Sequence, residues 1–262
     1  MKVAILAGGK GTRLAEETSI RPKPMVEVGG RPILWHIMMH YSRYGYNEFV
    51  IALGYLGDYI KRYFADYSAL HGSLTVELGG TNGGTVIQHE SAHPPWKVHL
   101  IETGAETLTG GRIKRLQPYL GDEPFFLTWG DGVSDVDISK LVEFHKAHGK
   151  LATVTTVRPP ARYGHITFDG DEIIGFEEKP QTAEGWINGA FFVLQPEVHD
   201  YIDGDMVMFE HAPMERLAAD RQLVANKHTG FWSAMDTLRD KHQLQKMWDS
   251  GNRPWVSWED KS

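Results

Sequence analysis

Short apolar runs recur along the chain, and longer stretches with a helical spacing of apolar residues lie between them. Apolar runs bounded by polar, glycine or proline positions predict buried strands. These runs occupy residues 3–6, 49–53, 98–101, 125–128, 151–157 and 190–194. Apolar positions three and four residues apart predict amphipathic helices. These stretches occupy residues 32–44, 57–67, 137–148, 210–219 and 237–248.

The alternation of these strands and helices predicts a three-layer α/β fold. A strand that is apolar at every position fits a mostly parallel, mixed sheet that is covered by helices on both faces. In such sheets, ligands bind beyond the carboxyl ends of the strands. The loops that follow the predicted strands are therefore where we expect the functional site.

The organisation of the chain favours one domain spanning residues 1–262. A chain of 262 residues is near the upper size for a single core, and no repeat or linker-like segment divides it. Residues 79–95 are rich in Gly, Thr, His and Pro, which predicts an excursion from the main sheet, either a hairpin or a lid. Residues 248–262 carry three tryptophans, and we expect them to pack on their own domain, with a subunit contact as the alternative.

Composition excludes several classes of partner and chemistry. The net charge of -7 gives no electrostatic basis for binding nucleic acid or an anionic membrane, so any bound phosphate must be held locally. The chain contains no cysteine, which excludes disulfides, zinc-thiolate sites and thiol nucleophiles and fits the reducing cytoplasm. The amino-terminal apolar run is too short to span a membrane. We therefore expect a cytoplasmic protein.

A glycine-rich loop, Gly8-Gly9-Lys10-Gly11-Thr12-Arg13, follows the first predicted strand directly. Glycine tolerates backbone angles and close approaches that let N–H groups converge on an anion, and the guanidinium of Arg13 suits phosphate oxygens. A P-loop would need Ser or Thr after Lys10, and a dinucleotide fingerprint would need Gly or Ala in place of Leu14. The loop predicts a phosphate site of another kind, and a simple tight turn is the alternative.

Lys23 lies between two prolines, Pro22 and Pro24, which restrict the backbone and limit where its ammonium can point. Beside the glycine-rich loop, this lysine is predicted to neutralise a bound phosphate. A solvated lysine in a loop shaped by prolines is the alternative.

These two elements together, from Leu6 to Met25, resemble the signature of the sugar nucleotidylyltransferases. The resemblance extends along essentially the whole chain. It is carried further by residues 30–36, 109–112, 129–133, 144–149, 176–180, 187–189, 230–232 and 235–237. The resemblance implies a Rossmann-like nucleotidyltransferase fold and transfer of a nucleoside monophosphate from a nucleoside triphosphate to a sugar 1-phosphate. Lys10 is not required by the family pattern, and its role stays open between a phosphate contact and a solvated side chain.

The resemblance implies that Asp131 and Asp236 hold Mg²⁺. Asp131 follows an apolar strand and is flanked by two glycines, and magnesium needs only one or two carboxylates besides substrate phosphates. The alternatives are a turn-forming role for Asp131 and a helix-capping role for Asp236. The 13 histidines show no tight ligand spacing that would indicate a different metal.

For the nucleotide, the resemblance implies that the helix start at Thr109-Gly110-Gly111-Arg112 meets the base edge with its backbone, while Arg112 reaches the triphosphate. The same four residues are closer to the cytidylyltransferases than to the thymidylyltransferases, which implies CTP. A helix start without a binding role is the alternative. The predicted nucleotide-binding residues are Leu6, Ala7, Gly8, Gly9, Gly11, Thr12, Arg13, Lys23, Thr109, Gly110, Gly111, Arg112 and Asp131.

For the sugar phosphate, the resemblance implies binding of α-D-glucose 1-phosphate by Glu178, Lys179, Asn188, Gly189 and Gly164. A surface charge pair at residues 178–179 and a hairpin turn at residues 188–189 are the alternatives. The predicted catalytic set is Arg13, Lys23, Arg112, Asp131 and Lys179.

Other functions remain open from the sequence. The same chemistry with UTP, dTTP or another hexose 1-phosphate is the closest rival, followed by a non-catalytic nucleotide sensor and, more distantly, an oxidoreductase. Members of the family are commonly oligomeric, so a homo-oligomer is expected, with contacts from residues 79–95 or the aromatic carboxyl-terminal segment.

Overall fold

A computed structural model describes residues 1–78, 84–89, 93–158, 165–169, 172–177 and 185–259. A seven-stranded sheet forms its centre, in the order β14-β10-β13-β8-β1-β4-β7. The strands are β1 (Val3–Leu6), β4 (Glu48–Leu53), β7 (Lys97–Glu102), β8 (Phe125–Trp129), β10 (Ala152–Val157), β13 (Ile187–Leu194) and β14 (Leu223–His228). Only β13 runs antiparallel to its neighbours, so the predicted mostly parallel, mixed sheet is confirmed. Strand β14 was not predicted, because it alternates exposed and half-buried residues at the sheet edge.

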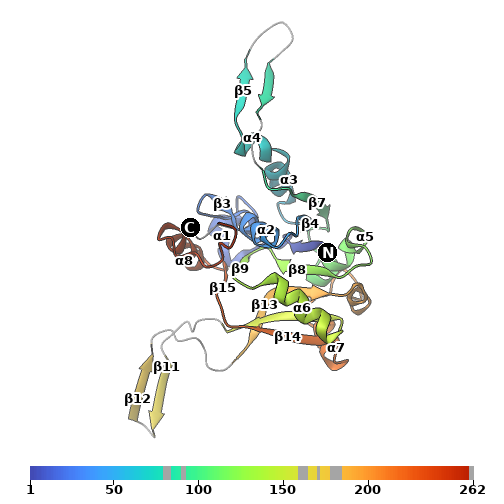
Figure 1. Cartoon of the computed structure of the whole chain (residues 1–262), viewed down its shortest axis with the longest axis vertical. Coiled ribbons are helices and arrows are strands. Elements are labelled where there is room, and N and C mark those ends of the chain that lie inside the picture. Colours follow the sequence, from blue (N-terminus) through green and yellow to red (C-terminus); the bar gives the residue numbers. More distant parts are fainter. Residues whose placement is uncertain (79–83, 90–92, 159–164, 170–171, 178–184, 260–262) are drawn as a thin grey trace.

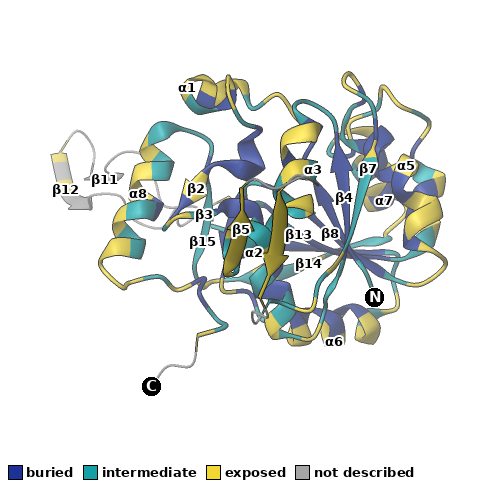
Figure 2. Cartoon of the chain, turned by 90° about the horizontal axis from the view of Figure 1, so that it is seen from above, coloured by how far each residue is buried: buried dark blue, intermediate teal, exposed yellow. Residues whose placement is uncertain are grey.

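Helices cover both faces of this sheet (Figure 2). In β1, Val3 and Ile5 face one apolar layer while Ala4 and Leu6 face the other, because successive strand residues point to opposite faces. The first layer contains residues of α2 (Ile33–Arg43), α3 (Gly57–Ala65), α6 (Ile138–His148) and α8 (Leu238–Asp249). The second contains residues of α5 (Thr109–Leu120), α7 (Ala212–Ala219) and the 3-10 helix η3 (Pro196–Tyr201). The predicted three-layer architecture is therefore confirmed.

The helices lie close to their predicted positions, with one break. The stretch predicted as a helix at residues 57–67 ends at Ala65, and Asp66 leaves helical geometry with φ -94° and ψ 6° before the short α4 (Tyr67–His71) begins. No helix in the described part of the chain has both the length and the apolar character needed to cross a membrane.

Two antiparallel hairpins project from the body of the molecule (Figure 1). One pairs β5 (Leu74–Glu77) with β6 (Thr85–Gln88), and the other pairs β11 (His165–Asp169) with β12 (Glu172–Glu177). Every residue of β5 and β6 is exposed, including Val76 and Val86, which lie opposite each other. This hairpin therefore has no packing partner among the described residues of its own chain.

The tryptophans near the carboxyl terminus pack on α2. Trp255 is buried, and its indole Nε1 donates to Nδ1 of His36 at 3.4 Å. Trp248 also contacts His36, with ring centroids 5.2 Å apart, and the Trp258 ring lies edge-on to Trp35 at 5.6 Å. These contacts fix the segment against the same face of the sheet as α2.

Candidate active site

The glycine-rich loop connects β1 to the short 3-10 helix η1 (Thr12–Leu14). Main-chain hydrogen bonds attach it to the end of β4: Ala7 N donates to Ala52 O at 3.0 Å, and Tyr55 N donates to Gly8 O at 3.0 Å. Gly11 has a positive φ of 61°, and a Cβ there would lie 2.9 Å from the Thr18 side chain. The loop therefore needs glycine at position 11 for both conformation and space.

A cavity of about 260 Å³ opens beyond the carboxyl ends of β1 and β8. It lies where ligands bind in parallel sheets, as the sequence predicted. The predicted site residues among its lining are Leu6, Ala7, Gly8, Gly9, Gly11, Arg13, Lys23, Thr109, Arg112 and Asp131. The lining residues that the sequence did not predict are Pro24, Thr107, Leu108, Trp129, Gly130 and Met208. The predicted loop, lysine and carboxylate therefore meet in one cavity.

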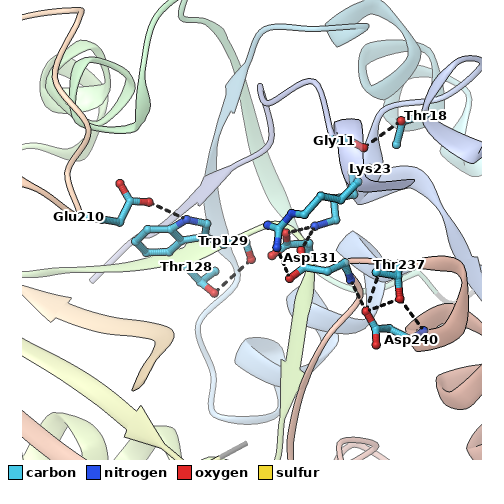
Figure 3. Close-up of polar contacts among 11 residues, drawn as sticks. Gly11, Thr18, Lys23, Thr128, Trp129, Asp131, Glu210, Thr237 and Asp240 are labelled. Carbon is cyan, nitrogen blue, oxygen red and sulfur yellow. Dashed lines mark hydrogen bonds and ion pairs between the residues drawn. The ribbon is translucent and has the colours of Figure 1, made fainter. Parts of the chain in front are cut away.

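Two cations and two carboxylates converge at this cavity (Figure 3). The Lys23 ammonium donates to Asp131 Oδ2 at 2.5 Å and to Asp236 Oδ1 at 2.6 Å. Arg13 Nη1 donates to the second oxygen of Asp236 at 2.8 Å. The Lys23 side chain is only 9% exposed, whereas the Arg13 side chain is 68% exposed. Lys23 is thus fixed inside the site, and Arg13 lies at its rim.

Burial alone would lower the pKa of the Lys23 ammonium, but the Asp131 and Asp236 carboxylates outweigh it and raise that pKa above its ordinary value. Lys23 is therefore a permanent positive charge at neutral pH. It lies in the 3-10 helix η2 (Lys23–Met25), and Pro22 before it is extended, with φ -68° and ψ 149°.

A small antiparallel pair brings the two carboxylates together. Strand β9 (Gly132–Ser134) follows Asp131, and it pairs with β15 (Trp232–Ala234), which precedes Asp236. The backbone of Met235 donates to Asp131 O at 2.8 Å and fixes the register. This pairing of distant segments was not predicted, because both strands are only three residues long.

Asp236 is not the cap of α8. Thr237 accepts the N-terminal hydrogen bond from Asp240 N, and Asp240 completes a capping box by accepting from the backbone of Thr237. The Asp236 carboxylate is free of this role and faces Lys23 and Arg13. The alternative that Asp236 serves only as a helix cap is therefore wrong.

The two carboxylates can share a cation. One ammonium reaches an oxygen of each within 2.6 Å, so Asp131 and Asp236 converge closely enough for a single divalent ion. Within the described ranges, no group of three or more His, Cys, Asp or Glu side chains is placed to hold a metal ion. A pair of hard oxygen donors suits magnesium, which completes its coordination with water and phosphate.

Arg112 was predicted to reach the triphosphate, but its guanidinium is turned toward the protein. Nη1 donates to Leu53 O and to Thr103 Oγ1, and Nη2 donates to Gly8 O at 3.0 Å. A Cβ on Gly8 would lie 2.3 Å from Nη1, so the glycine is needed for this approach. Arg112 also lines the cavity, and in this structure its guanidinium supports the glycine-rich loop, so its contact with the triphosphate stays a prediction.

The glycines at the start of α5 were predicted to meet the base edge, and in this structure they contact the backbone of residues 205–207. Gly110 N donates to Val207 O at 2.9 Å, so it is not free to meet a base. Neither Gly110 nor Gly111 lines the cavity. A Cβ on Gly111 would lie 2.4 Å from the Cα of Asp205. The two glycines are needed because the strap, residues 205–210, crosses the helix start at backbone contact.

We expect Gly111→Ala to destabilise the fold by at least about 2 kcal/mol, because the added methyl meets backbone that cannot move aside cheaply. Gly204→Ala is the matched control, since a Cβ there meets nothing within 4 Å. The free energy of unfolding in urea measures both. Equal stability of the two variants would show that close packing is not the reason for glycine at position 111.

The predicted sugar-binding residues are only partly described. Gly164, Glu178 and Lys179 lie outside the described residues. Asn188 and Gly189 lie in β13, so the alternative of a hairpin turn is wrong. Asn188 Oδ1 accepts from Ala190 N at 2.8 Å, and Trp232 Nε1 donates to Gly189 O at 2.8 Å. These bonds engage Asn188 Oδ1 and Gly189 O but not the amide NH₂ of Asn188.

Two further loop residues take no part in the cavity lining. Thr12 is exposed at the start of η1 and does not line the cavity, and its nucleotide-binding role stays a prediction. Lys10, whose role was open, forms an exposed ion pair with Glu106 at 3.0 Å.

The sequence missed several residues that line or support the cavity. Trp129 and Met208 line the cavity, and Glu210 accepts a hydrogen bond from the Trp129 indole at 3.1 Å. Trp129 could have been suspected from its place at the end of a buried strand. Met208 lies in an irregular segment whose sequence carries no motif. Glu210, predicted as the first residue of a helix, lies in the same segment because α7 begins only at Ala212.

Comparison with known proteins agrees with this geometry. The nucleotidyl transferase family matches residues 2–233. The chain is 48% identical over 260 residues to a glucose-1-phosphate cytidylyltransferase of Salmonella typhi, covering 99% of this chain and 100% of that protein. It is 31% identical to the mannose-1-phosphate guanylyltransferase catalytic subunit beta of Dictyostelium discoideum, covering 94% of this chain and 64% of that one.

A solved structure shares the fold. The crystal structure of HddC from Yersinia pseudotuberculosis superposes with a TM-score of 0.66 at 24% identity, covering 94% of this chain and 99% of that one. The resemblance inferred from the sequence is thus confirmed by relatives that match along the whole chain. The chain belongs to the nucleotidyl transferase family.

Proposed function

We propose that the chain transfers CMP from CTP to α-D-glucose 1-phosphate and releases pyrophosphate and CDP-glucose. The observation that carries the proposal is the convergence of Lys23 and Arg13 with Asp131 and Asp236 beside the glycine-rich loop. The choice of CTP and glucose 1-phosphate is supported by the similarity to the Salmonella typhi enzyme.

In this reaction, an oxygen of the sugar phosphate attacks the α-phosphorus of CTP in line. One P–O bond forms to the sugar phosphate, and the bond from the α-phosphorus to the bridging oxygen of pyrophosphate breaks. Such a transfer needs alignment and charge neutralisation more than covalent chemistry. The backbone of the glycine-rich loop can bind phosphate oxygens, and Lys23 can offset the charge that develops on the α-phosphate.

Asp131 and Asp236 would hold Mg²⁺, which neutralises phosphate charge and orients the triphosphate when it is bound. Lys179 would hold the attacking phosphate, and Glu178, Gly164, Asn188 and Gly189 would contact the sugar. Arg112 would act through the loop that it braces, since its hydrogen bonds to Gly8 and Leu53 fix the phosphate-binding backbone.

Pyrophosphate release tests the proposal directly. The protein is incubated with magnesium, glucose 1-phosphate and CTP, UTP, dTTP, ATP or GTP in turn. We expect release with CTP to exceed release with every other nucleotide. Preference for UTP or dTTP would keep the chemistry and change the substrate, and no release with any nucleotide would leave the non-catalytic sensor as the better account.

A cytoplasmic homo-oligomer is part of the same proposal. The exposed apolar side chains of the β5–β6 hairpin, Leu74, Val76, Val86 and Ile87, support a contact with a second copy, because a two-stranded hairpin alone is barely stable in water. Sedimentation velocity measures the state of assembly, and a monomer at micromolar concentration would contradict the proposal.

A further inference from the structure

Glu210 joins two walls of the cavity that come from different parts of the chain. It lies at the end of the strap, just before α7, and both of its carboxylate oxygens accept hydrogen bonds. Thr109 Oγ1 donates to Oε2 at 2.5 Å, and Trp129 Nε1 donates to Oε1 at 3.1 Å. Both donors line the cavity, whereas Glu210 does not.

The Trp129 ring is held on two sides. Its edge is fixed by Glu210, and its face stacks on Phe192 with centroids 5.2 Å apart and planes 28° apart. Trp129 ends β8, two residues before Asp131. In Figure 3 the ring lies between Glu210 on one side and the Lys23–Asp131 cluster on the other. The indole orientation is therefore set by Glu210 at one end and by the sheet beneath it.

The Thr109 side chain is also fixed by hydrogen bonds. Its hydroxyl donates to Glu210 and accepts from the backbone of Phe209 at 2.9 Å, so its single proton is committed to the carboxylate. The strap is also bonded to the start of α5 by Leu108 N, which donates to Asp205 O at 2.9 Å. These bonds place Met208, which is 41% exposed, on the cavity wall.

We propose that Glu210 is a positioning residue for the nucleoside part of the triphosphate. By fixing Trp129 and Thr109, it sets an apolar and aromatic wall, completed by Leu108 and Met208, against which a base and its ribose pack. Aromatic and thioether surfaces suit a flat, polarisable ring. Glu210 touches no reacting atom and acts only through the two donors. The proposal rests on the proposed function, since it takes CTP as the nucleotide.

The experiment measures CTP affinity by calorimetry together with steady-state kinetics. We expect Glu210→Ala to raise the Kd and the KM for CTP about tenfold, because it leaves the Trp129 and Thr109 donors unpaired and their side chains no longer fixed. The KM for glucose 1-phosphate should change less than twofold. Glu210→Gln should restore the affinity to within about threefold, because its amide oxygen can accept from Trp129 and its NH₂ can donate to Thr109.

Glu215→Ala is the matched control, because Glu215 is an exposed carboxylate on the neighbouring α7. It should leave every constant unchanged. Should Glu210→Ala fail to fold, Thr109→Val tests the same link by removing one donor while keeping the branched shape, and it should also weaken CTP binding.

The inference is overturned if the wild-type protein binds CTP and the folded Glu210→Ala variant has the same Kd for CTP. The same Kd in Thr109→Val overturns it where Glu210→Ala does not fold. It is equally overturned if the KM values for both substrates rise together, because that pattern indicates a general structural defect. If the wild-type protein does not bind CTP, both the proposed function and this inference are refuted.

Discussion

We expect Asp131→Asn to lower turnover by about 10²- to 10⁴-fold while the fold stays intact. The substitution keeps the shape of the side chain and removes one of the two negative charges that converge on Lys23. Charge stabilisation by a metal at a phosphoryl centre contributes several kcal/mol, and each 1.4 kcal/mol corresponds to about tenfold in rate. Lys23 retains its bond to Asp236, so the local structure should persist.

Pyrophosphate release gives the rate, and circular dichroism checks the fold. Asp137→Asn is the matched control: Asp137 caps α6 by accepting from Lys140 N, and asparagine caps a helix equally well. Binding of Mn²⁺ with CTP present provides a second readout, and Asp131→Asn should weaken it. A variant with near-normal turnover would refute the role given to Asp131.

Acid should unfold the protein between about pH 6.5 and pH 4. Burial lowers the pKa of His36 and of His40, both on α2, from 6.5 to about 4. His36 Nε2 donates to Val28 O, and its Nδ1 accepts from the Trp255 indole. Protonation of His36 would place a hydrogen on its Nδ1, so that this N–H and the Trp255 indole N–H, both donors, would face each other. His145 and His199 are shifted in the same direction by burial, also to about 4.

In this pH window the unfolded chain binds protons that the folded chain does not, so the free energy of unfolding falls as the pH falls. His36 and His40 together should account for roughly 4 kcal/mol between pH 6.5 and 4.5, which is a large share of the 5–15 kcal/mol typical of a folded protein. Below about pH 4 the folded histidines are protonated as well, and their contribution stops changing.

Urea unfolding at pH values from 7.5 to 4.5 measures this dependence. His40→Gln should flatten the slope, because glutamine can still donate to Val136 O, the partner of His40 Nε2, but does not titrate. A wild-type stability that stays constant from pH 7 to pH 5 would contradict the expectation.

The sequence by itself determined the buried strands of the sheet and the glycine-rich loop with Lys23, which line the cavity together. The strands β1, β4 and β8 and residues 191–194 of β13 are buried on both faces. A strand buried on both faces must be apolar at nearly every position, so each is visible as a continuous run. The glycine-rich loop and Lys23 are equally visible, because their chemistry depends on neighbours within a few residues along the chain.

Only the tertiary structure decided which other groups reach that site. Asp236 faces Lys23 because β9 pairs with β15. Arg112 packs against the glycine-rich loop, where its guanidinium bonds to Gly8 O. Gly111 packs against the backbone of the strap, a segment far from it in the sequence. Glu210 was predicted to begin a helix, but α7 begins only at Ala212, so Glu210 lies in the irregular strap, where helical periodicity does not show its direction. Contacts of this kind depend on side-chain direction and close approach between distant segments, which a pattern of neighbouring residues does not contain.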